Sequence, residues 1–309
     1  MSTHPARRLW AALETLHDVT YFADAVRPAG IELGLKGFWM TYFAWRAAPL
    51  GPVPAAPVVA MFAGFHPGAV ARALPESWSR TTPQACLEAR LAVSTAALGD
   101  AGADPEACVR AAEVLAPVAA AVDPTGRPLG AANAALELPG DPLARLWHLA
   151  TTLREHRGDG HVAALVNEGI TGLQAHLLQS ASGHMPREVL QRARVGWTDE
   201  DWAGAADALR GRGLLTAGPG LALTPAARCW ARSKRAPTSG PGTAASRHSA
   251  SGAPRRYSRC SGRRCARWPD PGCCRRSARP AWPAPGTASC PGVAARLWCP
   301  GRIHGPRAP

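Results

Sequence analysis

Three features are missing from this 309-residue sequence, and each absence excludes a class of protein. The longest apolar run, residues 52–65, is too short to span a bilayer and contains three prolines. Residues 1–19 hold no continuous apolar stretch of the kind found in a secretory signal. No segment before residue 183 alternates apolar and polar side chains, so a sheet is not expected there. We therefore expect a cytoplasmic protein that does not contact a membrane.

Signatures of several enzyme classes are also missing. The sequence contains no Gly-rich phosphate loop, no nucleophile elbow and no zinc-protease helix. Only Cys86 and Cys108 occur before residue 229, and neither has a histidine close by in the sequence. We expect both to be small buried side chains. The sequence therefore identifies neither a catalytic residue nor a cofactor.

Acidic residues are almost absent from residues 229–309, which hold 16 Lys and Arg against the single acid Asp270. Residues 1–228 hold 19 basic and 21 acidic residues, so the formal charge of +13 comes from the tail. The tail is rich in Cys, Pro and Gly, and its only aliphatic Leu, Ile or Val residues are Val293, Leu297 and Ile303. Since so few apolar side chains cannot offset chain entropy, we expect disorder.

Three interpretations of this basic tail compete. It could be an arm that binds nucleic acid, a Cys-rich metal-binding tract, or a GC-rich gene translated out of frame. The cysteine spacings never give the paired C-x₂-C of a zinc site. The absence of periodicity favours the frameshift, so we assign no function to residues 229–309.

Proline and glycine divide residues 1–183 into helices. We expect a first helix over residues 5–19, an aromatic-rich helix that ends at Pro49, and two short helices joined at residues 65–67. The pairs Thr82-Pro83, Asp104-Pro105 and Asp141-Pro142 predict three further helix starts. In "LREHRGDGHVAAL" we expect the helix to end at Arg157 and a second one to start near Gly160, which makes a helix–helix elbow. The second helix then continues for about five turns.

Residues 184–228 change in character. They predict a helix, a short connection at Gly196, a second helix capped by Thr198, and a hairpin of two short strands around residues 217–220. The segment "GRGLLTAGPGLALTP" is typical of the wing of a winged helix-turn-helix. This order of helix, helix and wing resembles the MarR-like winged-helix group.

A wider resemblance covers residues 1 to about 228. The segments that carry it are "RLWAALETLHDVTYF", "FAWRAAPLGPV", "GFHPGAVARALP", "DPLARLWHLATTLREHRGDGHVAAL" and "GWTDEDWAGAADALRGRGLL". Together they are similar to an actinobacterial helix-turn-helix family. The resemblance implies a mainly α fold, with a multi-helix domain over 1–183, a winged helix over 184–228 and no established reaction. It also implies a further helix after the wing, and this chain departs from that pattern at Cys229. A dimer contact made by that helix is therefore in doubt.

The elbow is the first candidate site. It gathers ionisable side chains that could bind a small molecule, with three of them as possible metal ligands. The candidate ligand-binding residues are His148, Glu155, His156, Asp159 and His161, and the metal ligands would be His156, Asp159 and His161. The plainer interpretation is that Gly158 ends one helix, Asp159 caps the next, and His156 satisfies local carbonyls. The sequence leaves both open.

A second candidate is an apolar pocket with an anion-binding arginine, lined by Tyr42, Trp45, Arg46 and His66. Aromatic residues at helical spacing are more often core residues, and we favour that interpretation. For DNA, the candidate phosphate contacts are Arg187, Arg192, Arg194, Arg210 and Arg212. The acidic start of the second helix would face phosphates unfavourably, so a winged helix used only for packing stays open.

The leading hypothesis is a ligand-responsive winged-helix regulator that binds DNA as a homodimer. The alternative is a helical enzyme or metal-binding protein that uses the elbow, with a purely structural winged helix. A structural scaffold is the third hypothesis.

Overall fold

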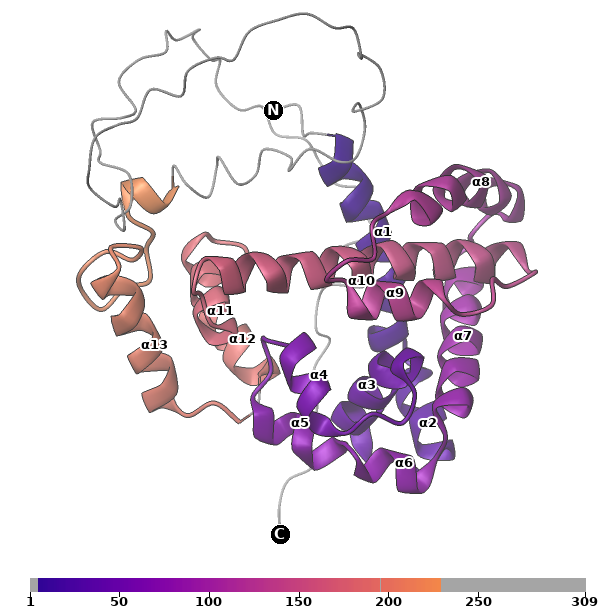
Figure 1. The fold of residues 1–309 in the computed structure, drawn as a ribbon, viewed down its shortest axis with the longest axis horizontal. Helices are drawn as coiled ribbons and strands as arrows, with labels where there is room; N and C mark the ends of the chain where they lie inside the picture. Colours follow the sequence, from indigo (N-terminus) through magenta and orange to yellow (C-terminus); the bar gives the residue numbers. More distant parts are fainter. Residues whose placement is uncertain (1–4, 195, 229–309) are drawn as a thin grey trace, which may run out of the picture. The chain divides into compact units, whose positions relative to one another are not determined.

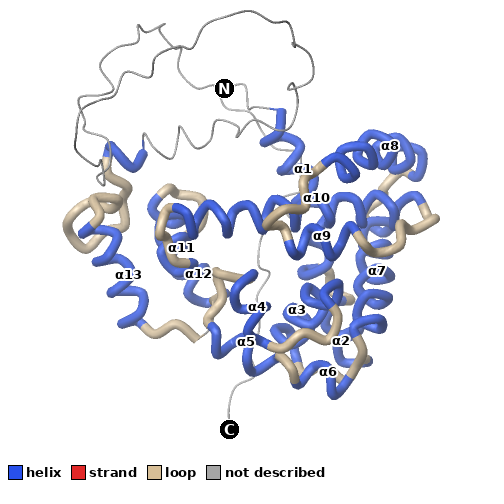
Figure 2. Tube along the Cα trace, viewed as in Figure 1, coloured by secondary structure: helices blue, strands red, loops and turns tan. Residues whose placement is uncertain are grey.

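The computed structural model describes residues 5–194 and 196–228, and in this part of the chain every regular element is a helix (Figures 1 and 2). The described residues fall within one compact unit. In chain order the helices are α1 (Pro5–Phe22), α2 (Val26–Glu32), α3 (Gly37–Ala47), the 3₁₀ turn η1 (Ala48–Leu50), α4 (Ala55–Met61), α5 (Pro67–Ala73), α6 (Glu76–Arg80), α7 (Pro83–Asp100), α8 (Pro105–Ala121), α9 (Pro128–Ala134), α10 (Pro142–Asn167), α11 (Gly172–Ala181), α12 (Arg187–Ala193) and α13 (Asp199–Gly211).

The mainly helical fold is therefore confirmed for the described residues. Across these helices, none combines the length and apolar content needed to cross a bilayer. The tail interpretations all concern residues 229–309, which lie outside the described residues.

The helix starts predicted from X-Pro pairs are confirmed. Thr82 accepts a hydrogen bond from the Ala85 N–H at the start of α7. Asp104 accepts from two N–H groups in the first turn of α8, and Asp141 accepts from Ala144 at the start of α10. In each case proline occupies the first helical position, where its missing N–H costs nothing. These signals are local, which explains why the sequence alone reveals them.

The predicted elbow at "RGDG" is wrong. Helix α10 runs without a break for 26 residues from Pro142 to Asn167, through Gly158 and Gly160 (Figure 1). A glycine inside a helix costs only about 1 kcal/mol relative to alanine. Of these two glycines, Gly160 also makes room for a neighbouring side chain. A side chain at Gly160 would collide with the Arg127 guanidinium, and one at Gly158 would lie 3.4 Å from Glu155 Oε2. Packing therefore outweighs the local preference to break.

The real break lies ten residues further on, where a continuous helix had been expected. Gly169 has a φ of 59°, and the Ile170 N–H bonds to the Leu165 carbonyl, which closes α10 with a left-handed glycine cap. Thr171 and Gln174 then form a reciprocal capping box that starts α11. The spacing Thr-x-x-Gln after Gly is a readable signal that the sequence interpretation missed.

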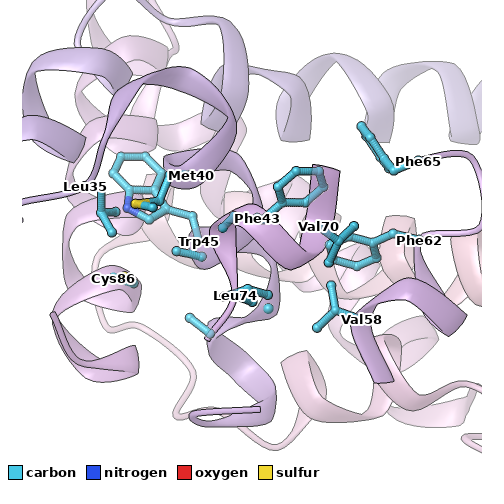
Figure 3. Packing of buried hydrophobic residues seen from close by; sticks show 14 of the residues in the cluster. Leu35, Met40, Phe43, Trp45, Val58, Phe62, Phe65, Val70, Leu74 and Cys86 are labelled. Atoms are coloured by element: carbon cyan, nitrogen blue, oxygen red, sulfur yellow. The ribbon is translucent and has the colours of Figure 1, made fainter. Parts of the chain in front are cut away.

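Three large hydrophobic cores, and a small cluster of Val19, Leu98 and Trp147, hold the described helices together. The first joins α2 to α5 with α7 and is dominated by aromatic side chains such as Phe43, Trp45 and Phe62 (Figure 3). The second joins α1, α8 and α10 through leucines that include Leu13, Leu115 and Leu149. Because α10 packs against α1, α7, α8 and α9, it is the central element of residues 5–167.

The third core begins at Ile170 and belongs to the C-terminal part of the described chain. It buries Leu177 of α11, Leu190 of α12, and Trp202 and Leu209 of α13. Helix α11, which the sequence placed in the N-terminal domain, thus shares its core with the two helices that follow. We refer to residues 170–228 as the three-helix part and to residues 5–167 as the helical body.

The predicted wing does not form strands in the described residues. The segment after α13 turns back on itself through one isolated antiparallel bridge between Leu215 and Leu223. Gly218 has a φ of 103°, and Pro219 beside it has no N–H to donate. Leu215 and Leu223 both point into the third core. Burial of these two leucines holds the turn in place, together with backbone hydrogen bonds from the Thr216 N–H to the Ala222 carbonyl and from the Thr224 N–H to the Leu214 carbonyl.

Candidate functional site

One face of α10 carries three buried ionisable groups of the helical body. His148, Glu155 and Asp159 are 5%, 2% and 6% exposed. With 3.6 residues per turn, these positions fall within about 40° of one another around the helix axis. His156 and His161 are roughly 140° apart on the same uninterrupted helix, so they cannot converge as an elbow would have allowed.

Glu155 is the centre of a buried ion-pair network. Arg46 of α3 donates Nε–H to Oε1 and Nη2–H to Oε2, each at 2.9 Å. Arg154 Nη1 lies 3.1 Å from Oε2, and its Nη2 lies 3.3 Å from Glu14 of α1. The two guanidinium groups hold the pKa of Glu155 far below its usual range despite the desolvation that opposes this. Glu155 is therefore a permanent carboxylate.

A chain of neutral donors leads to the same carboxylate. The Tyr21 hydroxyl donates to Glu155 Oε1 at 3.5 Å, so its oxygen is free to accept from His17 Nε2 at 3.1 Å. His17 Nδ1 then accepts from the Thr151 hydroxyl, also at 3.1 Å. Burial lowers the pKa of His17 well below its usual value, assisted by the positive charge of Arg154. When neutral His17 carries its proton on Nε2, each hydrogen of His17, Tyr21 and Thr151 in this chain has an acceptor.

Asp159 caps a helix, but not the one that the sequence suggested. Its Oδ2 accepts the N–H groups of Leu129 and Gly130, each at 2.9 Å, in the first turn of α9. The carboxylate therefore stabilises the positive end of a short helix that is 29 residues earlier in the chain. The predicted role as the N-cap of a second helix within α10 is wrong, because no such helix starts there.

We expect Asp159→Ala to lower the free energy of unfolding by about 1–2 kcal/mol, since a helix cap is lost and two buried N–H groups lose their acceptor. Urea unfolding followed by circular dichroism would measure the loss. Asp141→Ala, which removes an N-cap from α10 itself, is the matched control and should cost a similar amount. A change below about 0.3 kcal/mol for Asp159→Ala would contradict the capping role.

The three candidate histidines of α10 have separate surroundings. Burial and the nearby charge of Arg90 lower the pKa of His148 to about 4, and a bond with the Asn133 backbone opposes this. His156 Nε2 lies 2.9 Å from the carbonyl oxygen of Asp123, which is distant in sequence rather than local. His161 is exposed. In residues 5–194 and 196–228, no three His, Cys, Asp or Glu side chains are arranged to hold a metal. The structure therefore does not assemble the predicted set of His156, Asp159 and His161.

The second candidate site is partly assembled. The Arg46 guanidinium lies 4.1 Å from the centre of the Phe62 ring, and its Nη1 donates to the Tyr42 hydroxyl at 3.2 Å. Trp45 is fully buried in the first core, which agrees with the core interpretation. His66 uses Nδ1 to cap α5 through the Gly68 N–H, and its ring packs edge-on against Trp197. Arg46 and His66 thus have different partners.

The arginines predicted to contact DNA also differ in their surroundings. Arg212 donates to the carbonyls of Glu168 and Gly169 at 2.7 and 2.6 Å, so it closes the C-terminus of α10. Arg194 lies over the Phe65 ring at 4.5 Å, with its Nε 3.3 Å from His176. Arg210 pairs with Asp207 at 2.7 Å on α13. Arg187 is half-buried at the start of α12, and the Arg192 side chain lies outside the described residues.

The outer face of α13 carries small and acidic side chains. Its exposed residues are Asp199, Glu200, Asp201, Ala203, Gly204, Asp207, Ala208 and Gly211. A helix that reads bases in the major groove usually presents Arg, Lys, Asn or Gln there. Any contact of this helix with a duplex must therefore depend on arginines at its edges and on backbone groups.

Sequence reasoning missed several residues of the buried network. His17, Tyr21 and Arg154 were not singled out, although Tyr21 and His17 are four residues apart on one helix face and so were detectable as a pair. The bond between Tyr21 and Glu155 joins positions 134 residues apart, which no local pattern encodes.

Comparison with known proteins gives one match. A helix-turn-helix family is matched over residues 6–239, about three quarters of the chain. No curated protein and no solved structure matches. The matched range includes α1 to α13, so both the helical body and the three-helix part are features of the family.

Proposed function

Since this chain belongs to a helix-turn-helix family, we propose that it is a DNA-binding regulator whose helical body responds to a small molecule. The three-helix part would contact the duplex, with α12 and α13 as the helix-turn-helix pair. Family membership over residues 6–239 is the observation that carries this proposal. The order of helix, helix and turn over residues 187–224 also follows that of the MarR-like winged-helix group.

The third core supports an independent role for the three-helix part. Trp202 and Leu209 of α13 face Leu177 of α11, so one side of α13 is buried and the other is available to a duplex. Residues 170–228 hold six arginines and five acids. The net charge of +1 is small for a DNA reader, so we expect few phosphate contacts and a shallow salt dependence.

Two contacts support communication between the helical body and the three-helix part. Arg212 binds the carbonyls of Glu168 and Gly169 directly after α10, and His176 Nε2 lies 2.9 Å from the Gly64 carbonyl oxygen in the loop between α4 and α5. A change at the body could therefore alter the position of α11 to α13. This is the physical basis for a ligand response.

Fluorescence anisotropy with the full chain tests DNA binding. The probe is a duplex from the region upstream of the chain's own gene, and a scrambled duplex of the same composition is the reference. We expect tighter binding to the upstream duplex, with a slope of log K against log salt of about −2 to −3. Arg187→Ala plus Arg210→Ala should weaken binding and make that slope shallower by about 1–2.

The control is Arg110→Ala on α8, where the arginine is exposed and pairs only with surface acids. It should leave the affinity and the slope unchanged. Arg212 is unsuitable as a contact variant, because its loss would uncap α10. Equal affinity for the two duplexes, or a double variant that binds like the unmodified chain, would refute DNA recognition by this surface.

A further inference from the structure

Helices α1 and α10 each carry a stripe of charged and aromatic side chains where the two helices pack together. Three side chains on each helix share one face, because they are spaced by three and four residues. They are Arg7, Trp10 and Glu14 on α1, and Arg154, Arg157 and His161 on α10.

Two contacts set the register of these stripes. Arg154 Nη2 lies 3.3 Å from Glu14 Oε1. One turn further along α10, the Arg157 guanidinium lies 4.3 Å from the centre of the Trp10 ring. Positions therefore rise along α10 as they fall along α1. Arg7, one turn before Trp10, continues the stripe past Arg157, towards the C-terminal end of α10.

Arg157 is held in place but keeps its hydrogen-bonding edge. Its guanidinium stacks on the Trp10 ring, and the Trp10 Nε1–H donates to Glu14 Oε2 at 2.9 Å, which fixes the ring. Among the described residues, neither Arg7 nor Arg157 pairs with an acidic side chain, since Glu14 pairs with Arg154. A stacked arginine of this kind presents a planar fork of N–H groups that matches the oxygens of a phosphate.

The positive charges along these stripes repel one another. Desolvation lowers the pKa of Arg157, an effect that the charge of Glu14 opposes. The charges of Arg154 and Arg7 lower this pKa further. A bound anion would reduce a repulsion that the folded chain otherwise carries.

His161 extends this surface towards the three-helix part. It is exposed one turn after Arg157, and desolvation and the charge of Arg157 lower its pKa. Desolvation is the main cause of the lowered pKa of His176 in α11, and His161 is close enough to contribute to it. Along α10, Arg157 precedes Glu168, whose carbonyl binds Arg212, by about 17 Å. This is about half of one helical turn of B-DNA, so a single duplex is long enough to contact both places.

The charge of the three-helix part favours a second contact of this kind. The outer face of α13 is acidic, and residues 170–228 carry a net charge of only +1. Few backbone phosphates are therefore expected to bind there. Arginine contacts with the phosphate backbone position a protein on a duplex without reading its sequence, and they need no cavity.

We propose that Arg7, Arg157 and His161 of the helical body bind one phosphate group of the duplex that the three-helix part contacts. This inference rests on the proposed function, to which it adds a second contact surface. The stacked Arg157 donates two N–H bonds to the phosphate oxygens, Arg7 adds a second positive charge, and His161 donates one N–H. Because a backbone contact carries no base information, the surface raises affinity equally for every sequence.

Fluorescence anisotropy with the full chain, using the upstream and scrambled duplexes, tests this surface. Arg7→Gln plus Arg157→Gln should weaken binding to both duplexes by the same factor, about fivefold. The slope of log K against log salt should become shallower by about 1, as expected for one lost phosphate. Circular dichroism checks that the variant is folded. If it is not, Arg7→Gln alone replaces it, with about half of the change in slope.

The matched control is Arg27→Gln plus Arg110→Gln, which removes the same charge from exposed positions on α2 and α8. It should leave the affinity and the slope unchanged. An equal loss in this control overturns the proposal. Unchanged binding by Arg7→Gln plus Arg157→Gln, or a loss confined to the upstream duplex, also overturns it.

The unmodified chain and the Arg7→Gln plus Arg157→Gln variant together distinguish the two proposals. Equal affinity of the unmodified chain for both duplexes refutes sequence recognition, yet the expected loss on both duplexes in the variant still supports the body surface. A preference for the upstream duplex that the variant retains at full affinity supports the proposed function and overturns the body surface. A chain that binds neither duplex overturns both.

Discussion

Glu155→Gln is expected to lower the free energy of unfolding by about 3–5 kcal/mol, the range measured when one partner of a buried ion pair is removed. The substitution keeps the shape of the side chain but leaves Arg46 and Arg154 without their shared carboxylate. Urea unfolding at pH 7, followed by tryptophan fluorescence and circular dichroism, would measure the loss.

Glu106→Gln on α8 provides a matched control. Glu106 also pairs with an arginine, Arg110, but both side chains are largely exposed. Exposed pairs are typically worth 0–1 kcal/mol, so this variant should be within about 0.5 kcal/mol of the unmodified chain. Equal losses for the two variants would show that Glu155 is no more important than a surface acid.

The pairing of Glu155 with Arg46 and Arg154 also predicts that the stability of the fold depends on pH. The pKa of Glu155 is lower in the folded chain than in the unfolded one, so its contribution to stability is complete above about pH 4.5. The contribution decreases as the pH falls below that value and the unfolded state takes up the proton. The difference in stability between the unmodified chain and Glu155→Gln should therefore be constant from pH 5 to 7 and shrink at lower pH. A difference that grows in acid would contradict the assignment.

Trp202→Ala is expected to cost about 3–5 kcal/mol, the range for large aromatic residues removed from a core. Trp202 is 1% exposed and contacts the third core, which α11, α12 and α13 share. Because this core is separate from the first two, we expect hydrogen exchange to speed up mainly in residues 170–228. The Trp202→Ala variant should also lose DNA binding.

Val166→Ala tests whether that effect is specific. Val166 lies in the last turn of α10, just before the three-helix part, but it is 73% exposed. Its truncation should therefore change stability by less than about 0.5 kcal/mol. Uniformly faster exchange across residues 5–228 in Trp202→Ala would show that the three-helix part does not open separately from the body.

The sequence predicted those parts of the fold that depend on neighbours in the chain. The starts of α7, α8 and α10 follow from Thr82, Asp104 and Asp141 before proline, because a cap and its helix are within four residues of each other. The mainly helical class followed from periodicity in the same way. The cap at Thr171 was equally local, and it was overlooked because an apolar pattern continues through it.

The candidate sites were harder to predict, because their members are far apart in the chain. Arg46 was named as an anion-binding residue and Glu155 as part of a different site, yet the two bond directly across 109 residues. Arg212, named for DNA, caps α10, and Arg194 lies over Phe65. An arginine in the sequence reveals its charge but not its acceptor.

The sequence by itself determined the mainly helical class and the starts of helices such as α7, α8 and α10, since capping and periodicity act over one or two turns. Only the tertiary structure decided that α10 continues through Gly158 and Gly160. At those positions, packing with α9 and the Arg46–Glu155 pair outweighs the lower helix stability that two glycines cause. It also decided that Asp159 serves α9, because a carboxylate binds the helix end that packing brings to it.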